Sequence, residues 1–254
     1  MNERLKGSVA LVTGASSGIG EATARALAAE GAAVALVARR KQRLEQLAAE
    51  IGQQGGPFVV VEADLTDQTQ AAAAVEQTAR ELGRLDILVN NAGVMLLGPA
   101  VDAPLEEWER MVNINLRGLL YVTHAALPHL LRAAEDAPRG VADVVNISSV
   151  AGRLARAGSA VYNLTKFGVT AFSEALRQEV TGRHLRVSVV EPGAVRTELS
   201  SHLRPEVREQ ALQRFKGVER LEAEDIADLI VYTVTRPRRV ALNEILVRPT
   251  EQGT

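Results

Sequence analysis

The chain has 254 residues, of which 46% are hydrophobic and only 3% aromatic, so its core has to be built from Ala, Val, Leu and Ile. A formal net charge of −2 excludes the broad basic surface that a nucleic-acid partner needs, and the absence of cysteine excludes disulfides and thiolate sites. No apolar run approaches the roughly 18 residues of a membrane span, and no apolar signal segment precedes the first predicted strand. We therefore expect a cytoplasmic protein with no nucleic-acid and no membrane partner.

Short apolar runs alternate with helical periodicity along the whole chain. This alternation predicts βαβ crossovers and a parallel sheet, and the uninterrupted apolar runs are typical of strands covered on both faces. We expect strands at 8–13, 33–38, 58–62, 86–90, 142–147, 185–191 and 244–247. We expect helices at 19–31, 41–51, 67–82, 104–134, 159–181 and 223–235. No change of composition marks a second domain.

Three local features refine this outline. Asp64 and Thr66 are candidate caps of the helix at 67–82, because short polar side chains bond the free N–H groups of a first turn. Pro128 is expected to bend or break the helix at 104–134. Residues 197–220 mix charged and apolar side chains after a strand, which fits either a mobile lid over a site or a plain surface excursion.

The first strand leads into TGASSGIG at 13–20, in which Gly14, Gly18 and Gly20 precede a predicted helix. Glycines let the backbone approach a pyrophosphate, and the N-terminus of the next helix favours an anion. A glycine-rich turn alone is a weak signal, because any tight strand–helix turn can have one. The strand before it and the helix after it favour dinucleotide binding.

Basic residues follow the second strand at the place where an NAD-binding unit usually has an acid. Arg39, Arg40, Lys41 and Arg43 stand there, with no carboxylate among them. An arginine pairs with a 2′-phosphate through two parallel hydrogen bonds, as we expect of Arg39. Basic side chains at a helix start are unfavourable next to the positive end of the helix dipole, so this cluster indicates that an anion binds there. The sequence therefore predicts NADP(H) rather than NAD(H); the alternative is a basic start to a solvated helix.

Small or polar residues also follow later strands. Asp64 is either an acceptor for the adenine amino group or a helix cap, and Asn90 is expected to brace the backbone. The other such residues are Asn91, Ala92, Gly93, Ser148, Ser149, Pro192 and Gly193. Because the carboxyl ends of parallel strands share one edge of the sheet, these clusters predict a ligand site at that edge.

The stretch at 149–166 holds a serine, a tyrosine and a lysine with a specific spacing. Tyr162 and Lys166 stand at i and i+4, so they share one helix face, and an ammonium beside a phenol lowers the pKa of the phenol. Carbonyl reduction builds negative charge on the substrate oxygen, which hydroxyl donors from Tyr162 and Ser149 would stabilise. An ordinary tyrosine pKa near 10 suits neutral catalysis poorly, and Lys166 would correct this. We interpret Tyr162 as an acid catalyst, Lys166 as the group that lowers its pKa, and Ser149 as a second donor to the oxyanion.

Together these segments resemble the short-chain dehydrogenase/reductase family. The resemblance rests on TGASSGIG, NNAG at 90–93, Asn115, the Ser149…Tyr162-x-x-x-Lys166 set and PGAVRT at 192–197. It implies a single-domain Rossmann fold over residues 1–254, with a doubly wound, seven-stranded parallel sheet flanked by helices. It also implies hydride transfer between a nicotinamide and a carbonyl or alcohol. Within the family, VMLLGP at 94–99 and the tail EILVRPT are similar to bacterial NADP-dependent reductases of the clavulanic acid dehydrogenase type.

The resemblance assigns roles to individual residues. Tyr162 is the general acid in reduction and the base in oxidation, Lys166 lowers its pKa and holds the nicotinamide ribose, and Ser149 bonds the substrate oxygen. Asn115 resembles the asparagine that bends a helix and carries a proton-relay water. The implied cofactor contacts are Gly14, Ser16, Ser17, Gly18, Ile19, Gly20, Arg39, Arg40, Asp64, Leu65, Asn91, Ala92, Gly93, Tyr162, Lys166, Pro192, Gly193, Val195 and Thr197. The family further implies a homo-oligomer, either a dimer or a tetramer.

The predicted substrate pocket is apolar, which suggests an apolar or moderately sized aldehyde or ketone. Its expected residues are Met95, Leu96, Val150 and Leu154. Arg153 and Arg156 lie nearby and are either partners of a substrate carboxylate or exposed loop residues. The four histidines show no metal-ligand spacing, and we assign no metal.

Three rival functions differ from this interpretation. A non-catalytic dinucleotide-sensing protein would keep the glycine loop without needing Ser149, Tyr162 and Lys166 together. An epimerase or dehydratase of the same fold generally has a longer C-terminal substrate part than this chain. An NAD-preferring alcohol dehydrogenase differs only in its cofactor.

Overall fold

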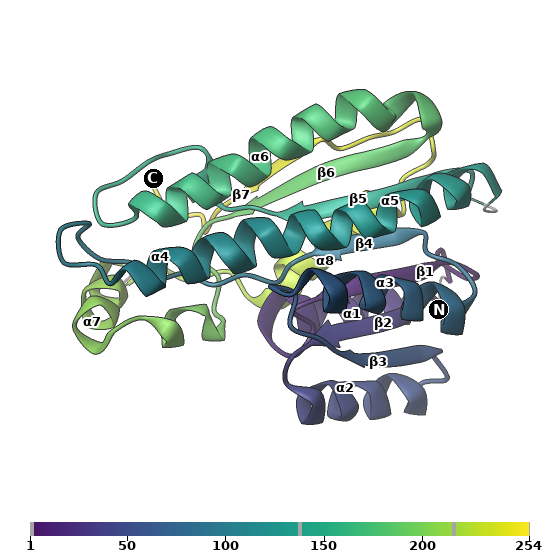
Figure 1. The fold of residues 1–254 in the computed structure, drawn as a ribbon, viewed down its shortest axis with the longest axis horizontal. Coiled ribbons are helices and arrows are strands. Elements are labelled where there is room, and N and C mark those ends of the chain that lie inside the picture. Colours follow the sequence, from purple (N-terminus) through teal and green to yellow (C-terminus); the bar gives the residue numbers. More distant parts are fainter. Residues whose placement is uncertain (1–2, 137–138, 215–216, 254) are drawn as a thin grey trace.

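The computed structural model describes residues 3–136, 139–214 and 217–253 (Figure 1). Within these residues seven strands form one parallel sheet in the order β3-β2-β1-β4-β5-β6-β7. The strands are β1 (Val9–Thr13), β2 (Ala33–Ala38), β3 (Phe58–Glu62), β4 (Ile87–Asn90), β5 (Ala142–Ile147), β6 (Leu185–Pro192) and β7 (Glu244–Val247). The main helices are α1 (Gly18–Ala29), α2 (Lys41–Gln53), α3 (Gln68–Leu82), α4 (Leu105–Val112), α5 (Leu119–Asp136), α6 (Ala160–Val180), α7 (Pro205–Arg214) and α8 (Ala223–Val234). The predicted seven-stranded, doubly wound sheet is confirmed.

The order of the strands reverses next to β1, which has β2 on one side and β4 on the other. Val12 is in register with Leu36 of β2 and with Val89 of β4. A crevice opens where chain connections leave a parallel sheet in opposite directions, and ligands bind there beyond the carboxyl ends of the strands. The topology therefore places a binding site between the ends of β1 and β4.

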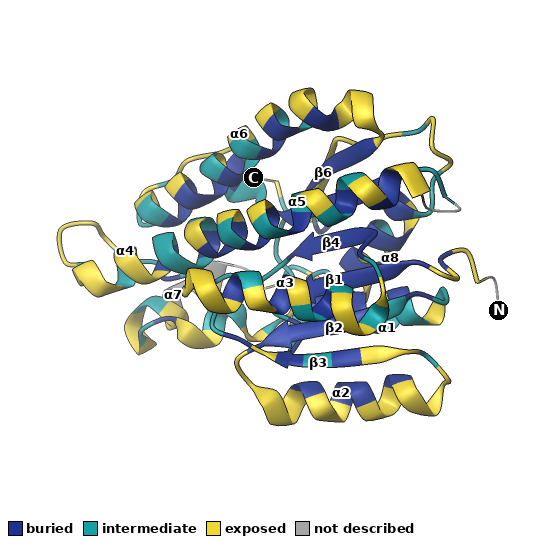
Figure 2. Cartoon of the chain, turned by 45° about the vertical axis from the view of Figure 1, so that its right-hand side comes forward, coloured by how far each residue is buried: buried dark blue, intermediate teal, exposed yellow. Residues whose placement is uncertain are grey.

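Helices cover both faces of the sheet, and burial follows this arrangement (Figure 2). On one face α1, α2 and α8 bury side chains such as Leu27, Leu44 and Ile230. On the other face α3, α5 and α6 bury smaller ones such as Ala126 and Val180. The central strands are buried on both sides, which is the physical reason that they read as uninterrupted apolar runs.

The helical region predicted at 104–134 is interrupted, but not where we expected. Helix α5 runs through Pro128, because the buried side chains of Ala126 and Leu130 on either side hold it against the sheet. The irregular part is the π-helical segment Asn113–Gly118 between α4 and α5. Pro128 therefore does not break the helix, and the interruption falls on Asn115, the residue that the resemblance links to a bent helix.

The cap of α3 is also one that the sequence did not single out. Asp67 is the N-cap, and its carboxylate accepts hydrogen bonds from the backbone N–H groups of Thr69 and Gln70. Asp64 instead closes a turn of its own, in which Oδ1 accepts from the backbone N–H and the hydroxyl of Thr66. Asp64 and Thr66 are therefore not the cap of this helix.

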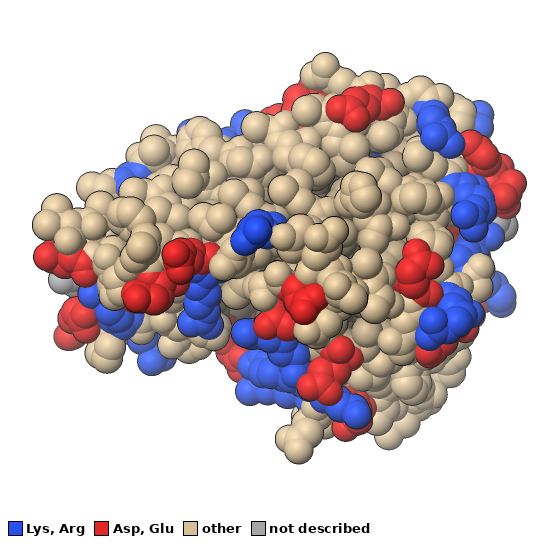
Figure 3. Space-filling view, viewed as in Figure 1, with Lys and Arg blue, Asp and Glu red and all other residues tan. Residues whose placement is uncertain are grey.

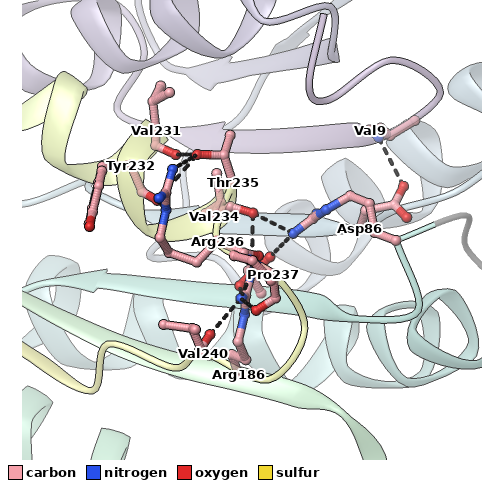
Figure 4. A network of polar contacts seen from close by, with 12 residues as sticks. Val9, Asp86, Arg186, Val231, Tyr232, Val234, Thr235, Arg236, Pro237 and Val240 are labelled. Atoms are coloured by element: carbon pink, nitrogen blue, oxygen red, sulfur yellow. Dashed lines mark hydrogen bonds and ion pairs between the residues drawn. The ribbon is translucent and has the colours of Figure 1, made fainter.

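Buried charges join the amino ends of the strands, at the edge opposite the predicted site (Figure 4). Asp143 at the start of β5 forms ion pairs with Arg186 and Arg139, and its side chain is 1% exposed. Arg186 also donates to the backbone carbonyls of Val234, Arg236 and Val240. One buried arginine therefore closes the C-terminal end of α8 and ties the following loop to the sheet.

The helices can be compared with the length and apolar character that a membrane span needs. In the part of the chain that the structure describes, no helix is both long and apolar enough to cross a bilayer.

Asp143→Ala is expected to lower the free energy of unfolding by about 3–5 kcal/mol, because it leaves Arg186 and Arg139 charged and unpaired in the interior. Urea denaturation followed by circular dichroism measures the change. Glu135→Ala, which removes an exposed partner of Arg183, is the matched control and should change little. Equal midpoints for the two variants would contradict the structural role of the buried pair.

Candidate active site

A large cavity of about 790 Å³ opens at the carboxyl edge of the sheet. It brings together the glycine-rich loop, the end of β2, the turn after β4, the stretch at 149–166 and the PGAVRT loop. The predicted site residues that line it are Gly14, Ser16, Ser17, Gly18, Ile19, Arg39, Arg40, Asp64, Leu65, Asn91, Ala92, Gly93, Met95, Ser149, Val150, Leu154, Tyr162, Lys166, Pro192, Gly193, Val195 and Thr197. Residues from distant segments, such as Gly14 and Thr197, thus share one pocket, as the topology requires.

Three predicted residues do not line the cavity: Gly20, Leu96 and Asn115. Leu96 is 6% exposed and packs in a core cluster with Met111 and Tyr162, so its assignment to the substrate pocket is wrong. Side chains alternate along an extended segment, and Met95 and Leu97 face the cavity while Leu96 points away. The apolar segment could be predicted from the sequence, but not which of its side chains face the cavity.

The glycine-rich loop is shaped by close backbone contacts. The backbone N–H of Gly14 donates to the carbonyl of Val37, and Gly14 has a φ of +68°, which suits glycine far better than other residues. A Cβ on Gly20 would lie 2.4 Å from the carbonyl oxygen of Gly14. The lack of a side chain at Gly20 therefore allows α1 to pack closely against the end of β1. With this packing, the loop can face a phosphate at the N-terminus of α1.

The turn after β4 is held to this loop by the hydroxyl of Thr13. Its Oγ1 accepts hydrogen bonds from the backbone N–H groups of Asn91, at 2.9 Å, and Ala92, at 3.0 Å. The Asn90 side chain donates to Asn146 and Thr123 in the interior, which confirms that it braces the structure. The turn thus presents backbone and small side chains to the cavity, so that a ribose can approach closely.

The arginines at the end of β2 contact both the glycine loop and the segment after Thr197. The Arg40 guanidinium donates to Ser16 Oγ at 3.0 Å and to Ser17 Oγ at 2.5 Å. It also forms an ion pair with Glu198, 2.8 Å away. Arg39 is exposed and lines the cavity. Two guanidinium groups therefore stand beside the loop, in the place where the sequence predicts a 2′-phosphate.

Tyr162 and Lys166 are both buried on α6 and face the cavity. Lys166 Nζ donates to the carbonyl of Ile147 at the end of β5, 2.9 Å away, and lies 5.8 Å from the centre of the Tyr162 ring. The Ser149 hydroxyl accepts from the backbone N–H of Ala151 and donates towards the carbonyl of Pro192. The three predicted catalytic side chains therefore converge from β5 and α6.

The pKa of Tyr162 does not follow the expectation from the sequence. Burial raises it to about 12, and a hydrogen bond with Ser149 only partly opposes this. Burial also lowers the pKa of Lys166 to about 8, because the ammonium loses its hydration. The sequence predicted that the charge of Lys166 would lower the phenol pKa, but in this structure desolvation of the phenol dominates and raises the pKa.

Asn115 lies behind the cavity in the π-helical segment. Its Oδ1 accepts from the backbone N–H of Val94 at 2.8 Å, and its Nδ2 donates to the carbonyl of Val94 and to Thr165 Oγ1. Asn115 is 2% exposed, so these bonds fix the start of the Val94–Leu97 segment against α6. Single-turn π segments are frequent at functional sites.

Ser148 and Arg153 have structural partners. The Ser148 hydroxyl donates to the backbone carbonyl of Lys166, and both Ser148 and Ser149 line the cavity. Arg153 forms ion pairs with the buried Glu191 and with Glu244, does not line the cavity and is itself exposed, so the role of an exposed loop residue is the one that fits. Burial raises the pKa of Glu191, and Arg153 partly offsets this.

The segment at 197–220 contributes described residues to the lining of the cavity. It holds a short helix, Glu198–His202, and α7, which lies beyond the carboxyl ends of the strands at the left of Figure 1. Its residues Thr197, Leu199 and Val207 line the cavity, while positions 215 and 216 lie outside the described residues. The position of the segment fits a lid.

Sequence reasoning missed several polar residues of the site. Gln252, close to the C-terminus, accepts from the backbone N–H of Ala194 at 2.9 Å and so supports the PGAVRT loop from below. Arg156, which the sequence places near the site, lines the cavity, and so do three arginines that the sequence did not single out, namely Arg110, Arg220 and Arg248. They come from elements scattered through the sequence, and no local pattern announces them. In the described residues no group of three His, Asp or Glu side chains could hold a metal ion.

A doubly wound sheet with a glycine loop at its reversal point and a Ser–Tyr–Lys set beside it defines a nucleotide-dependent oxidoreductase. Comparison with known proteins agrees with this class. The family model described as short chain dehydrogenase matches residues 8–208. The chain belongs to the short-chain dehydrogenase family.

Relatives and solved structures extend this likeness over the whole chain. An uncharacterized oxidoreductase of Staphylococcus saprophyticus is 35% identical over 252 residues, 98% of each chain. A glycine betaine reductase of Emericella nidulans is 42% identical over 251 residues, 98% of this chain but only 19% of that larger protein. A closed form of serine dehydrogenase complexed with NADP+ superposes with a TM-score of 0.85 at 33% identity, covering 97% and 96% of the two chains. The narrower likeness to the clavulanic acid dehydrogenase type stays a prediction.

The lowered pKa of Lys166 gives stability a testable pH dependence. Its ordinary value is 10.5 and its folded value about 8, so the unfolded chain binds more protons between these values, and stability must rise with pH there. Tyr162, with a pKa of about 12, opposes this only above about pH 10. Lys166→Met removes the effect, so its stability advantage over the wild type should shrink by about 2 kcal/mol from pH 8 to pH 10.

Urea denaturation at pH 7, 8, 9 and 10 measures that difference. Lys41→Met provides the control, because it makes the same substitution at an exposed lysine on α2. A difference between Lys166→Met and the wild type that does not change with pH contradicts the shifted ammonium.

Proposed function

We propose that the chain is an NADP(H)-dependent reductase of aldehydes or ketones, acting also in the reverse, alcohol-oxidising direction. The observation that carries this proposal is the convergence of Ser149, Tyr162 and Lys166 on the cavity that the glycine loop and the arginines also line. A non-catalytic nucleotide sensor has no use for that convergence. We also propose that residues 1–254 are one Rossmann-type domain and that 197–220 is its substrate loop.

The residues present suit the reaction in its reducing direction. NADPH, when bound, supplies the hydride. Tyr162, whose pKa lies at about 12, keeps its proton at neutral pH and is therefore available as the acid that protonates the substrate oxygen. Ser149 adds a second hydroxyl at the same oxygen. Lys166, with a pKa of about 8, is still mostly charged at neutral pH and stabilises the phenolate that proton transfer leaves behind.

The preference for NADP(H) over NAD(H) rests on the fit of the residues at the end of β2. Arg39 and Arg40 line the cavity, as do Ser16 and Ser17, and the residues directly after β2, 39–43, include no acid. Guanidinium groups and hydroxyls are donors that match phosphate oxygens. The serine dehydrogenase that superposes on the chain was solved with NADP+, which supports the same cofactor here.

The expected substrate is an apolar or moderately sized carbonyl compound. Around Tyr162 the cavity is lined by Met95, Val150 and Leu154, which have no charge to offer a polar substituent. Arg110 and Arg156 stand in the same cavity, and they make a carbonyl compound with a carboxylate the second candidate class.

A homo-oligomer, dimer or tetramer, remains part of the proposal. Apolar side chains on α5 and α6 support it, since Leu120, Leu164 and Phe167 are 41%, 59% and 42% exposed. Exposed apolar side chains of this size on adjacent helices are typical of subunit contacts. The cytoplasmic location stays a prediction from the sequence.

Tyr162→Phe is expected to lower kcat by about 10²–10⁴-fold, because it removes the proton donor and leaves the pocket shape almost unchanged. NADPH binding, measured by the change in its fluorescence, should stay within about twofold, because the phenol is not expected to carry the affinity for the cofactor. Tyr121→Phe, on α5 and away from the cavity, is the control and should keep full activity. A fully active Tyr162→Phe variant contradicts the assigned role.

Oxidation of NADPH, and separately of NADH, with a panel of aldehydes and ketones tests the class, the cofactor and the substrate together. We expect turnover with apolar carbonyls and at least about tenfold higher kcat/KM with NADPH, the factor that one charge-assisted contact to the 2′-phosphate represents. The panel includes matched compounds with and without a carboxylate. Higher activity with NADH would favour the alcohol dehydrogenase alternative, and no turnover despite cofactor binding would favour the sensor.

A further inference from the structure

A carboxylate from the lid segment engages the arginines at the start of α2. Glu198 Oε2 lies 2.8 Å from Arg40 Nη1, and its Oε1 lies 2.6 Å from Arg43 Nη1. The glutamate comes from the segment after β6, so these pairs join parts of the chain more than 150 residues apart. Glu198 is the first residue of a short helix capped by the Thr197 hydroxyl, which bonds the backbone N–H of Leu199. The position of the carboxylate is therefore fixed by the fold.

The chemistry of this cluster is that of an occupied anion site. Hydrogen bonds from Arg40 and Arg43 lower the pKa of Glu198 to about 2, so the carboxylate is ionised at any working pH. Arg40 meanwhile donates to Ser16 and Ser17, which belong to the glycine loop. Arg40 thus holds an anion with one nitrogen while the others hold the loop next to it.

The cluster coincides with the predicted place of the 2′-phosphate. Arg39, Arg40 and Glu198 all line the cavity. In Figure 3 basic and acidic side chains lie side by side between the places that α7 and α2 occupy in Figure 1. The carboxylate is 45% exposed, and the Arg40 and Arg43 side chains are 44% and 48% exposed, so an incoming phosphate can reach them.

We infer that Glu198 is a specificity-determining residue whose carboxylate competes with the 2′-phosphate of NADP(H) for Arg40 and Arg43. This inference rests on the proposed function, because it requires that the cavity binds a nicotinamide dinucleotide. A cofactor with a 2′-phosphate has to displace the carboxylate from the arginines or bind beside it, and two anions at one place repel each other. A cofactor without that phosphate leaves both ion pairs intact. Arg40 and Arg43 favour NADP(H) over NAD(H), and Glu198 therefore makes this difference in affinity smaller.

Glu198→Gln tests the inference, because it keeps the size of the side chain and removes its charge. The ratio of the Kd of NADH to the Kd of NADPH, measured by calorimetry on the whole chain without substrate, should rise about threefold to tenfold, the range that two exposed ion pairs represent. Adenosine 2′-monophosphate should bind more tightly to the variant by a similar factor, and adenosine 5′-monophosphate should not. These two probes separate the effect of the 2′-phosphate from contacts at the nicotinamide end.

Glu206→Gln is the matched control, because it removes the same charge from α7, where Glu206 pairs with Arg204. It should leave the ratio within about twofold, since long-range effects of a surface charge are screened by salt. An unchanged or lower ratio in Glu198→Gln overturns the inference while NADPH binding by the wild type leaves the proposed function standing. A wild-type chain that binds neither dinucleotide overturns the proposed function itself.

Discussion

The active site depends on where one buried ammonium group is held. Lys166 Nζ donates to the carbonyl of Ile147 at the end of β5, and the backbone carbonyl of Lys166 accepts from the hydroxyl of Ser148. These two bonds tie α6 to the strand end at the same level. Tyr162, one helical turn earlier, and Ser149, one residue after Ser148, are thereby brought to one point of the cavity. A helix and a strand end joined in this way are more rigid than a loop, as acid–base chemistry requires.

The same arrangement sets the electrostatic character of the site. Burial favours the neutral form of both groups, which places the pKa of Tyr162 at about 12 and that of Lys166 at about 8. Near neutral pH, below the lower of these two values, the site holds a neutral phenol beside an ammonium that is close to losing its proton. Such a pair is suited to giving a proton to an oxygen that gains negative charge. In the reverse reaction Tyr162 has to act as a base, so a positive charge near the phenol has to stabilise the phenolate. Lys166 is the side chain that supplies this charge.

Much of the fold could be predicted because burial on both faces leaves an uninterrupted apolar signal in each strand. The catalytic stretch could be predicted because i, i+4 spacing is local. Other features depend on distant partners: the π segment at Asn115 follows from its bonds to Val94 and Thr165, and the phase of Leu96 from packing on Met111. The pairing of Glu198 with arginines far back in the sequence has no local signature. The raised pKa of the phenol required knowledge of its burial.

Asp143 at the amino ends of the strands and Lys166 at their carboxyl ends are buried in opposite electrostatic settings. At the amino edge Asp143 and Arg186 neutralise each other, and the arginine fills its remaining donors with backbone carbonyls. At the carboxyl edge Lys166 is buried without a carboxylate, and burial alone accounts for the shift of its pKa. A charge that is paired in the interior holds together the segments that carry the two partners. An unpaired one lowers stability, and its pKa changes with whatever binds next to it. The parallel topology makes this division possible, because it separates the ends where strands begin from the ends where ligands bind.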